Sequence, residues 1–420
     1  MIKCLKGNVI FAEEKNKLKV MPHSYLVIDD EISAGVYESL PEEYKNALVE
    51  DFGDKLIIPG FMDVHLHAPQ WLNKGVGYSE ELLPWLQKYT FPLESKFADI
   101  KFAEKYYKLF VDELKNSGTT RACIFASRHY EATRLLIELM KESGIGGYVG
   151  KVNMDRNSSE ELQETYEDSV RETTMLAEEY SGDDNALVKF ILTPRFVPST
   201  TSELMTKLGE IAEKYNLHVQ SHLDENVDEV AWVKELHSDI PTFTEVYEHF
   251  GLLPDNRTVM AHCIHNNDRE IEVLKKHNTF IAHCPLSNFN LASGIAPIKR
   301  YMQEGLDVGL GSDISGGHTL YMPVSCVAAV SASKMYHVSH REYSPLTFAE
   351  AFYLLTKGGG KFFGKVGSFE KGYECDALVI DDSDITSIDG ITLEERLEKF
   401  IYTGNRSNIV RIYCRGKQIK

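Results

Sequence analysis

Short apolar segments recur along the middle of this 420-residue chain, and amphipathic stretches separate them. The stretches 99–118 and 201–216 place apolar residues at helical spacing and end near Gly or Asn, as connecting helices do. Eight strands that alternate with helices predict an α/β fold of the (β/α)₈ TIM-barrel type. Periodicity alone leaves a doubly wound parallel sheet open as the alternative. The eight apolar segments are 55–68, 119–127, 146–154, 186–196, 217–225, 258–265, 279–288 and 306–314.

The two ends of the chain differ in pattern from the middle. Residues 1–58 and 365–420 contain short β-type pieces that Gly, Asp and Asn interrupt, with a helical pattern only near 392–401. We therefore expect the two ends to pair into one small sheet domain beside a barrel of residues 59–364. The glycine-rich segment 357–372 lacks the Gly-Lys-Ser/Thr ending of a phosphate-binding loop, so we interpret it as the exit from the barrel.

Composition excludes several classes of partner. Acidic residues outnumber basic ones by 63 to 45, and the formal net charge of −18 would repel nucleic acid. The first residues lack the pattern of a signal peptide, and no apolar run approaches the ~20 residues that cross a bilayer. We therefore expect a cytoplasmic protein with no membrane partner. The seven cysteines form no Cys-x-x-Cys pair, which indicates free and mostly buried thiols.

Side chains that can bind metals stand at the ends of several apolar segments. His65 and His67 alternate around Leu66, so in an extended strand both imidazoles face the same way. Two unrelated surface histidines are the alternative explanation for this pair alone. Because barrel active sites form where the strands end, the recurrence predicts a metal centre. The later segments end in His222, His262, His283 and Asp313.

Glu225 lies three residues after His222, just beyond a predicted strand end. Its carboxylate could exchange protons with a metal-bound water there without binding the metal itself. A helical pattern follows, so a helix N-terminal glutamate favoured by the helix dipole is an equally weighted alternative. Asp224 and Asp228 fit that structural role better.

Four further side chains follow the first and fourth segments. Gln70 and Trp71 come after the His-x-His strand, and Arg195 with Phe196 ends the fourth segment. An aromatic ring can stack on a flat polar heterocycle, while an amide and a guanidinium can bond to its edge. Each residue taken alone is more often a packing residue or a surface charge.

The chain resembles the guanine deaminases of the amidohydrolase superfamily. The resemblance covers residues 57–317, and the segment 367–380 matches the return of the chain into that superfamily's split β-sandwich. It implies a TIM-type barrel with a β-sandwich built from the N- and C-terminal segments. His-x-His, His-Cys and Ser-Asp identify only the superfamily, whereas HAPQ, TPRF and SHLDEN are specific to guanine deaminases. In order, the similar motifs are PGFMDVHLHAPQW, LTPRFVPSTT, QSHLDEN, AHC, HCPLSN and GLGSDISGG.

The same resemblance implies the chemistry of the metal centre. One Zn²⁺ per chain, with Fe²⁺ as the alternative ion, would be bound by His65, His67, His222 and Asp313. Glu225 would be the proton shuttle, and Asp313 would take a proton from the hydrolytic water. His262 would contact that water or complete the coordination, and this choice stays open.

The resemblance also implies a substrate and an assembly. Gln70, Arg195 and Phe196 match guanine-recognition positions. Trp71 follows Gln70 in the HAPQW motif and is expected to bind the substrate as well. His222, Glu225 and Asp313 would also contact the substrate. The implied reaction is hydrolytic deamination of guanine to xanthine and ammonia by a cytoplasmic homodimer. Two segments depart from the family pattern, HTLYM after SDISGG and FNLASG after HCPLSN.

Three other functions compete with this interpretation. A binuclear amidohydrolase that cleaves a cyclic amide needs a carboxylated lysine at the end of the fourth strand. Lys189 lies six residues before Arg195, ~20 Å away along an extended strand and at its wrong end. A deaminase of cytosine, a pterin, oxidised guanine or an adenosine-like nucleoside would keep the same metal centre. A non-catalytic barrel protein would have no reason to keep the strand-end ligands and Glu225.

Overall fold

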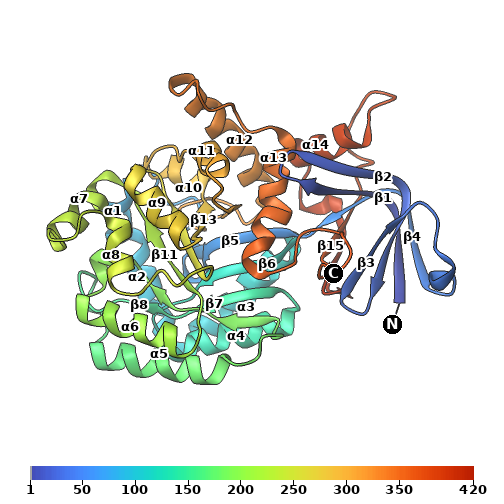
Figure 1. Cartoon of the computed structure of the whole chain (residues 1–420). Helices are drawn as coiled ribbons and strands as arrows, with labels where there is room; N and C mark the ends of the chain where they lie inside the picture. The colour runs from blue at the N-terminus through green and yellow to red at the C-terminus, as the bar shows by residue number, and fades with distance from the viewer. Residues whose placement is uncertain (1) are drawn as a thin grey trace.

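The computed structural model describes residues 2–420, which form a barrel and a separate sheet (Figure 1). Each of the eight apolar segments supplies one barrel strand, and neighbouring strands are parallel. The predicted fold class is therefore confirmed. The strands are β5 (Phe61–His67), β6 (Thr119–Phe125), β7 (Gly146–Gly150) continued by β8 (Val152–Asn153), β9 (Val188–Phe190) continued by β10 (Thr193–Pro194), β11 (Val219–Leu223), β12 (Thr258–His262), β13 (Phe280–His283) and β14 (Val308–Leu310).

The strands close into a ring, which a doubly wound sheet would not do. β5, β6, β7 and β9 form one hydrogen-bonded set, and β11 to β14 form another. Leu192 joins the two sets by a bridge to Val219. On the other side, the backbone N–H of Asp313 donates to the carbonyl of His65 at 2.9 Å. The ring therefore has no open edge.

Helices surround the barrel (Figure 1). The predicted helices 99–118 and 201–216 are α3 and α6, whose first turns are capped by the side chains of Asp99 and Thr201. The longer helices are α3 (Ile100–Asn116), α4 (Tyr130–Ser143), α5 (Tyr166–Tyr180), α6 (Ser202–Lys214), α7 (Val227–Leu236), α8 (Phe243–His249), α9 (Asp268–Lys276), α10 (Pro285–Asn290), α11 (Ile298–Gln303), α12 (Met322–Ser339), α13 (Phe348–Tyr353) and α14 (Leu393–Thr403).

Short helical turns fill the connections. The first turn after β5 is η2 (Ala68–Asn73). After residues 74–81, four short helical segments follow one another without a break: α1 (Leu82–Trp85), η3 (Leu86–Thr90), α2 (Phe91–Glu94) and η4 (Ser95–Ala98). The other short turns are η1 (Glu42–Tyr44), η5 (Val197–Ser199), η6 (Leu354–Gly358), η7 (Lys361–Phe363) and η8 (Arg406–Asn408).

The two ends of the chain share one seven-stranded sheet beside the barrel (Figure 1). The strand order in this sheet is β17-β16-β15-β4-β1-β2-β3. β4 from the N-terminal segment pairs with β15 from the C-terminal segment, and this pairing joins the two ends of the chain. The limits 1–58, 59–364 and 365–420 for the domains stay a prediction. The strands of the seven-stranded sheet are β1 (Ile2–Glu14), β2 (Lys17–Asp29), β3 (Ile32–Tyr37), β4 (Leu48–Pro59), β15 (Ala377–Ile380), β16 (Ile409–Cys414) and β17 (Lys417–Gln418).

Two other expectations concern thiols and membranes. All seven cysteines are buried and free, as predicted. Within residues 2–420, none of the helices has both the length and the apolar character needed to cross a bilayer.

Candidate active site

A bulge in β5 aims the first two predicted ligands into the barrel. Between Asp63 and Leu66, three residue steps of β5 pair with two steps of β6. An extra residue of this kind resets the alternation of side chains beyond it. His65 and His67 therefore both face the interior, where their rings are only 2% and 3% exposed.

The ends of four strands bring five potential ligands together. Nε2 of His65 lies 3.2 Å from Oδ1 of Asp313, and Nε2 of His67 lies 3.1 Å from Nε2 of His222. Nε2 of His262 lies 3.8 Å from the other Asp313 oxygen. The ligand atoms of His65, His67 and His222 all lie within 4.8 Å of one another, as do those of His65, His262 and Asp313. The predicted metal ligands thus form one cluster.

The cluster fits a divalent cation. Nε2 of His65 and of His262 is buried without a hydrogen-bond partner, which is costly unless a ligand satisfies it. The ring N–H of His222 donates to the carbonyl of Arg195 at 2.7 Å, and that of His262 donates to Asn288 at 2.9 Å. Both rings therefore turn the lone pair of Nε2 toward the cluster. Imidazoles with one carboxylate are typical ligands of zinc and iron.

Burial sets the protonation of these groups. Burial and the neighbouring His65 hold the pKa of His67 and of His222 well below the usual range. Burial lowers the pKa of His262 to about 4. Burial alone would raise the pKa of Asp313, but the adjacent imidazoles of His65 and His262 lower it overall. At neutral pH His67, His222 and His262 are therefore neutral and Asp313 is ionised, which are the forms that bind metals.

Four residues at the same strand ends have strained backbone conformations. Asp224, His262, Cys263 and Asp313 adopt positive φ angles of 49°, 73°, 49° and 43°. Left-handed conformations in residues other than glycine cost of order 1 kcal/mol or more and cluster at functional sites. The chain thus holds the strand ends in conformations that local preference disfavours.

Glu225 faces the metal cluster and does not cap its helix. Its Oε2 lies 3.3 Å from Nε2 of His262. Asn226 caps α7, and Glu229 accepts hydrogen bonds from the backbone N–H groups of Glu225 and Asn226. Burial, followed by the charges of Asp313 and Glu229, raises the pKa of Glu225 well above its usual range. The geometry therefore favours the proton-transfer interpretation over the capping one.

The two aspartates beside it have other surroundings. Asp224 is buried and accepts a hydrogen bond from the amide of Asn266. Asp228 is exposed in the first turn of α7, where a negative charge suits the helix dipole. Asp228 fits the helix-terminal role expected for it, whereas Asp224 precedes the Asn226 cap and bonds instead to the loop between β12 and α9.

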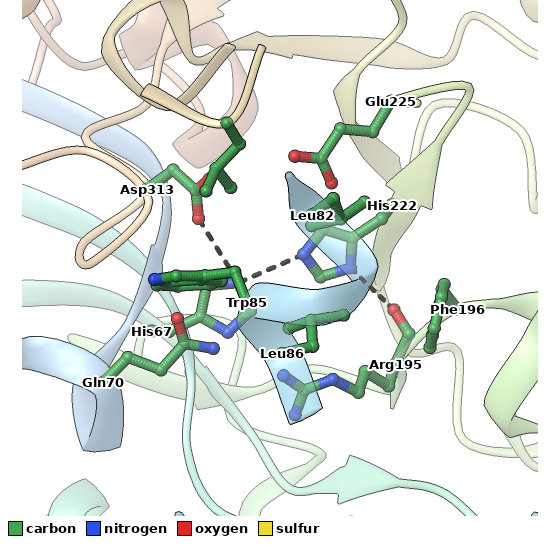
Figure 2. Close-up of a pocket in the computed structure, with 11 residues that line it drawn as sticks. His67, Gln70, Leu82, Trp85, Leu86, Arg195, Phe196, His222, Glu225 and Asp313 are labelled. Atoms are coloured by element: carbon green, nitrogen blue, oxygen red, sulfur yellow. Dashed lines mark hydrogen bonds and ion pairs between the residues drawn. The ribbon is translucent and has the colours of Figure 1, made fainter. Parts of the chain in front are cut away.

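One pocket opens directly onto the cluster (Figure 2). Gln70, Arg195 and Phe196 line it, so the structure brings these predicted recognition residues together with the metal cluster. Apolar side chains from the turns after β5 and from the end of α10 complete its walls. The full lining is His67, Gln70, Leu82, Trp85, Leu86, Arg195, Phe196, His222, Glu225, Leu291 and Asp313.

Two residues named from the sequence do not reach the pocket. The indole N–H of Trp71 donates to Glu113 on α3 at 3.1 Å, and Trp85 lies in the pocket wall in its place. His283 follows Ile281 by two residues in β13, and Ile281 packs in the core cluster outside the barrel interior. Strand alternation therefore turns His283 away from the cluster.

Sequence reasoning also missed Glu94, a buried residue at the end of α2. Its carboxylate bonds to Gln70 and to Arg195, which lie 24 and 101 residues away along the chain. No local pattern in the sequence indicates contacts between residues that lie so far apart along the chain. The apolar segment that contains Leu82 and Trp85 carried no signal for the pocket either.

The lysine that a binuclear site would require is elsewhere. Nζ of Lys189 donates to the carbonyl of Asp184 at 2.6 Å, in the loop that precedes β9. This loop lies at the N-terminal end of the barrel strands, opposite the cluster. The binuclear alternative therefore lacks its bridging ligand at Lys189.

Comparisons with known proteins agree with this site. The Amidohydrolase family model matches residues 56–419. The guanine deaminase of Dictyostelium discoideum is 40% identical and covers 100% of this chain and 98% of that protein. The human guanine deaminase is 38% identical over 87% of this chain and 83% of that protein. A crystal structure of guanine deaminase from C. acetobutylicum, with guanine bound in its active site, is 46% identical with a TM-score of 0.97 and covers both chains fully. The chain belongs to the amidohydrolase family and, within it, to the guanine deaminases.

Proposed function

We propose that the chain catalyses the hydrolytic deamination of guanine to xanthine and ammonia with one bound divalent ion. The observation that carries this proposal is the pocket that joins the ligand cluster to Gln70 and Arg195. The relatives named as guanine deaminases, one of them with guanine in its active site, support the choice of substrate. Zinc is the first choice of ion and Fe²⁺ the second, and the ligands are His65, His67, His222 and Asp313.

The chain's own residues then move protons. When bound, the ion supplies Lewis acidity that lowers the pKa of water toward about 7. Asp313 is ionised and can accept a proton from the attacking water. Burial raises the pKa of Glu225, which favours the protonated form, and Glu225 donates this proton to a ring nitrogen of the substrate. The C–O bond forms at the carbon that bears the amine. Glu225 then takes the proton of the new hydroxyl group and passes it to the amine, so the C–N bond breaks, the C=O bond of xanthine forms and ammonia leaves. The proton held by Asp313 returns to Glu225, and both carboxyl groups regain their starting states.

Other pocket residues orient the base and the water. Arg195 donates to the carbonyl oxygen of guanine, Gln70 bonds to the ring edge, and Phe196 stacks on the ring face. His262 stands between Glu225 and Asp313, so we assign it contact with the hydrolytic water.

An ammonia assay tests the proposal. Purified protein is incubated separately with guanine, cytosine and adenine, and its metal content is measured in parallel. We expect rapid release of ammonia from guanine alone. Faster turnover of cytosine or adenine than of guanine would contradict the substrate assignment.

We further propose a cytoplasmic homodimer, as the family resemblance implies. Light scattering at micromolar concentration should give twice the mass of the chain. A single-chain mass would contradict the dimer.

A further inference from the structure

A buried carboxylate connects the two polar side chains that would bind the base. Glu94 is 1% exposed at the end of α2. Its Oε1 accepts from Nε2 of Gln70 at 2.8 Å and from Nη2 of Arg195 at 3.1 Å, and its Oε2 accepts from Nη1 of Arg195 at 2.6 Å. Gln70 and Arg195 line the pocket, whereas Glu94 lies behind them. Glu94 therefore acts on the pocket through these two residues.

The bond to Glu94 decides which end of the Gln70 amide faces the pocket. An amide can be turned by 180° with little change in shape, so its orientation follows from its hydrogen bonds. Both oxygens of Glu94 accept from the guanidinium of Arg195, and a carboxylate paired in this way can only accept, so the Nε2 group of Gln70 points at Glu94. The Oε1 atom is left on the other side of the amide, and within residues 2–420 no group donates to it. Gln70 thus offers the pocket a hydrogen-bond acceptor.

The same carboxylate fixes the guanidinium of Arg195. One N–H of each Nη atom points at Glu94, and the ring of Phe91 lies 5.0 Å from the guanidinium carbon. The Nε–H group and the second N–H of each Nη remain as donors for a ligand. Burying the charge of Glu94 or of Arg195 without its partner would be costly, so the ion pair holds both side chains in this arrangement.

We propose that Glu94 is the positioning residue that sets the hydrogen-bond polarity of the base pocket, with an acceptor from Gln70 beside donors from Arg195. The proposal rests on the proposed function. Guanine matches this arrangement because its C6 carbonyl accepts and the adjacent ring N1–H donates. 2-Aminopurine keeps the reacting C2 amine but has no carbonyl, and its N1 is an acceptor that would face Oε1 of Gln70.

The test compares the two bases with the Glu94→Gln variant. The new amide can donate as well as accept, so Gln70 is free to turn its Nε2 group toward the pocket. We expect kcat/KM for guanine to fall about 10- to 100-fold, mainly through a higher KM. 2-Aminopurine should lose less or gain, so the preference for guanine should shrink about 10-fold or more. Equal losses on both bases, or no loss on either, would overturn the proposal.

A matched control separates positioning from stability. Asp376 is another buried carboxylate that pairs with an arginine through two hydrogen bonds, at 2.7 and 3.0 Å from Arg121, but it lies beside the start of β6. Asp376→Asn should lower the melting temperature and leave the guanine preference unchanged. If Glu94→Gln does not fold, Glu94→Asp keeps the charge, shortens the reach, and should shift the same preference in the same direction by a smaller factor.

Equilibrium binding gives a readout without turnover. Xanthine retains the C6 carbonyl and the N1–H group, and Trp85 in the pocket wall can report its binding by fluorescence. We expect Glu94→Gln to weaken xanthine binding about 10-fold or more, and unchanged binding would overturn the proposal. Absence of guanine turnover by the unmodified protein would instead contradict the proposed function, so the two failures are distinguishable.

Discussion

Both ends of the barrel bury polar and ionisable groups, but the hydrogen-bond partners of these groups differ. At the N-terminal end, Arg121 bonds to Asp376 and to Glu374, so the charges are paired within the chain. At the C-terminal end, Nε2 of His65 and of His262 is buried without a partner. A closed network stabilises a fold, whereas unpartnered groups at strand ends can bind a ligand. The contrast predicts that substitutions at one end change activity and those at the other change stability.

The largest effect on activity should come from the metal ligands. His65→Ala or Asp313→Ala should abolish metal binding and reduce guanine turnover below detection, because the ion depends on the whole ligand set. Metal analysis of the unmodified protein should give about one ion per chain. Two tightly held ions per chain, or an active variant without metal, would contradict this assignment.

Glu225→Gln should leave folding and metal content intact while slowing turnover. The amide keeps the shape of the side chain but removes the transferable proton, whose usual contribution is ~10²- to 10⁴-fold. Steady-state kinetics on guanine measure the loss. A variant that keeps more than about a tenth of the normal rate would argue against a proton shuttle.

Strand periodicity made much of this site predictable from the sequence. A parallel barrel delivers the end of every strand to one face, so His222, His262 and Asp313 could be expected beside the His-x-His pair before any contact was known. The bulge between Asp63 and Leu66 could not be expected, because it depends on how β5 pairs with β6. The spacing of residues along each strand thus predicted which side chains bind the metal. The pairing of β5 with β6 determines the direction in which His65 and His67 point.

The sequence could not predict which residues of the turns after β5 face the pocket, because this depends on how the turns pack. Gln70 and Trp71 are neighbours in η2, yet Gln70 reaches the pocket and Trp71 bonds to Glu113 on α3. The turns after β5 have no period that would mark Trp85 or Glu94 as inward-facing. Their positions follow from packing against strands far away in the chain, which sequence spacing does not encode.

Arg195→Ala should have the next largest effect on activity. Loss of the guanidinium removes the donors to the carbonyl of guanine, and kcat/KM should fall about 10²-fold while the metal stays bound. It also leaves Glu94 buried without its charge partner, so Arg195→Lys serves as the control that keeps a cation there. Unchanged guanine kinetics in Arg195→Ala, or comparable turnover of guanine and adenine by the unmodified protein, would show that Arg195 does not recognise the base.

The smallest effect on activity is expected at the closed end of the barrel. Arg121→Met would leave the fully buried carboxylate of Asp376 with the backbone N–H of Arg415, at 2.8 Å, as a remaining donor. Breaking a buried ion pair from one side costs about 3 to 5 kcal/mol, so the free energy of unfolding should fall by that amount in urea titrations.

The kinetics of Arg121→Met complete the comparison. Because Arg121 lies at the start of β6 and the cluster at the strand ends, kcat/KM for guanine should stay within about 2-fold of normal under folding conditions. Arg171→Met is the matched control, since Arg171 is an exposed arginine that also pairs with an aspartate, and its loss should cost less than about 1 kcal/mol. Were Arg121→Met to lower kcat/KM as strongly as Arg195→Ala while still folded, the division between a stabilising end and a reactive end of the barrel would fail.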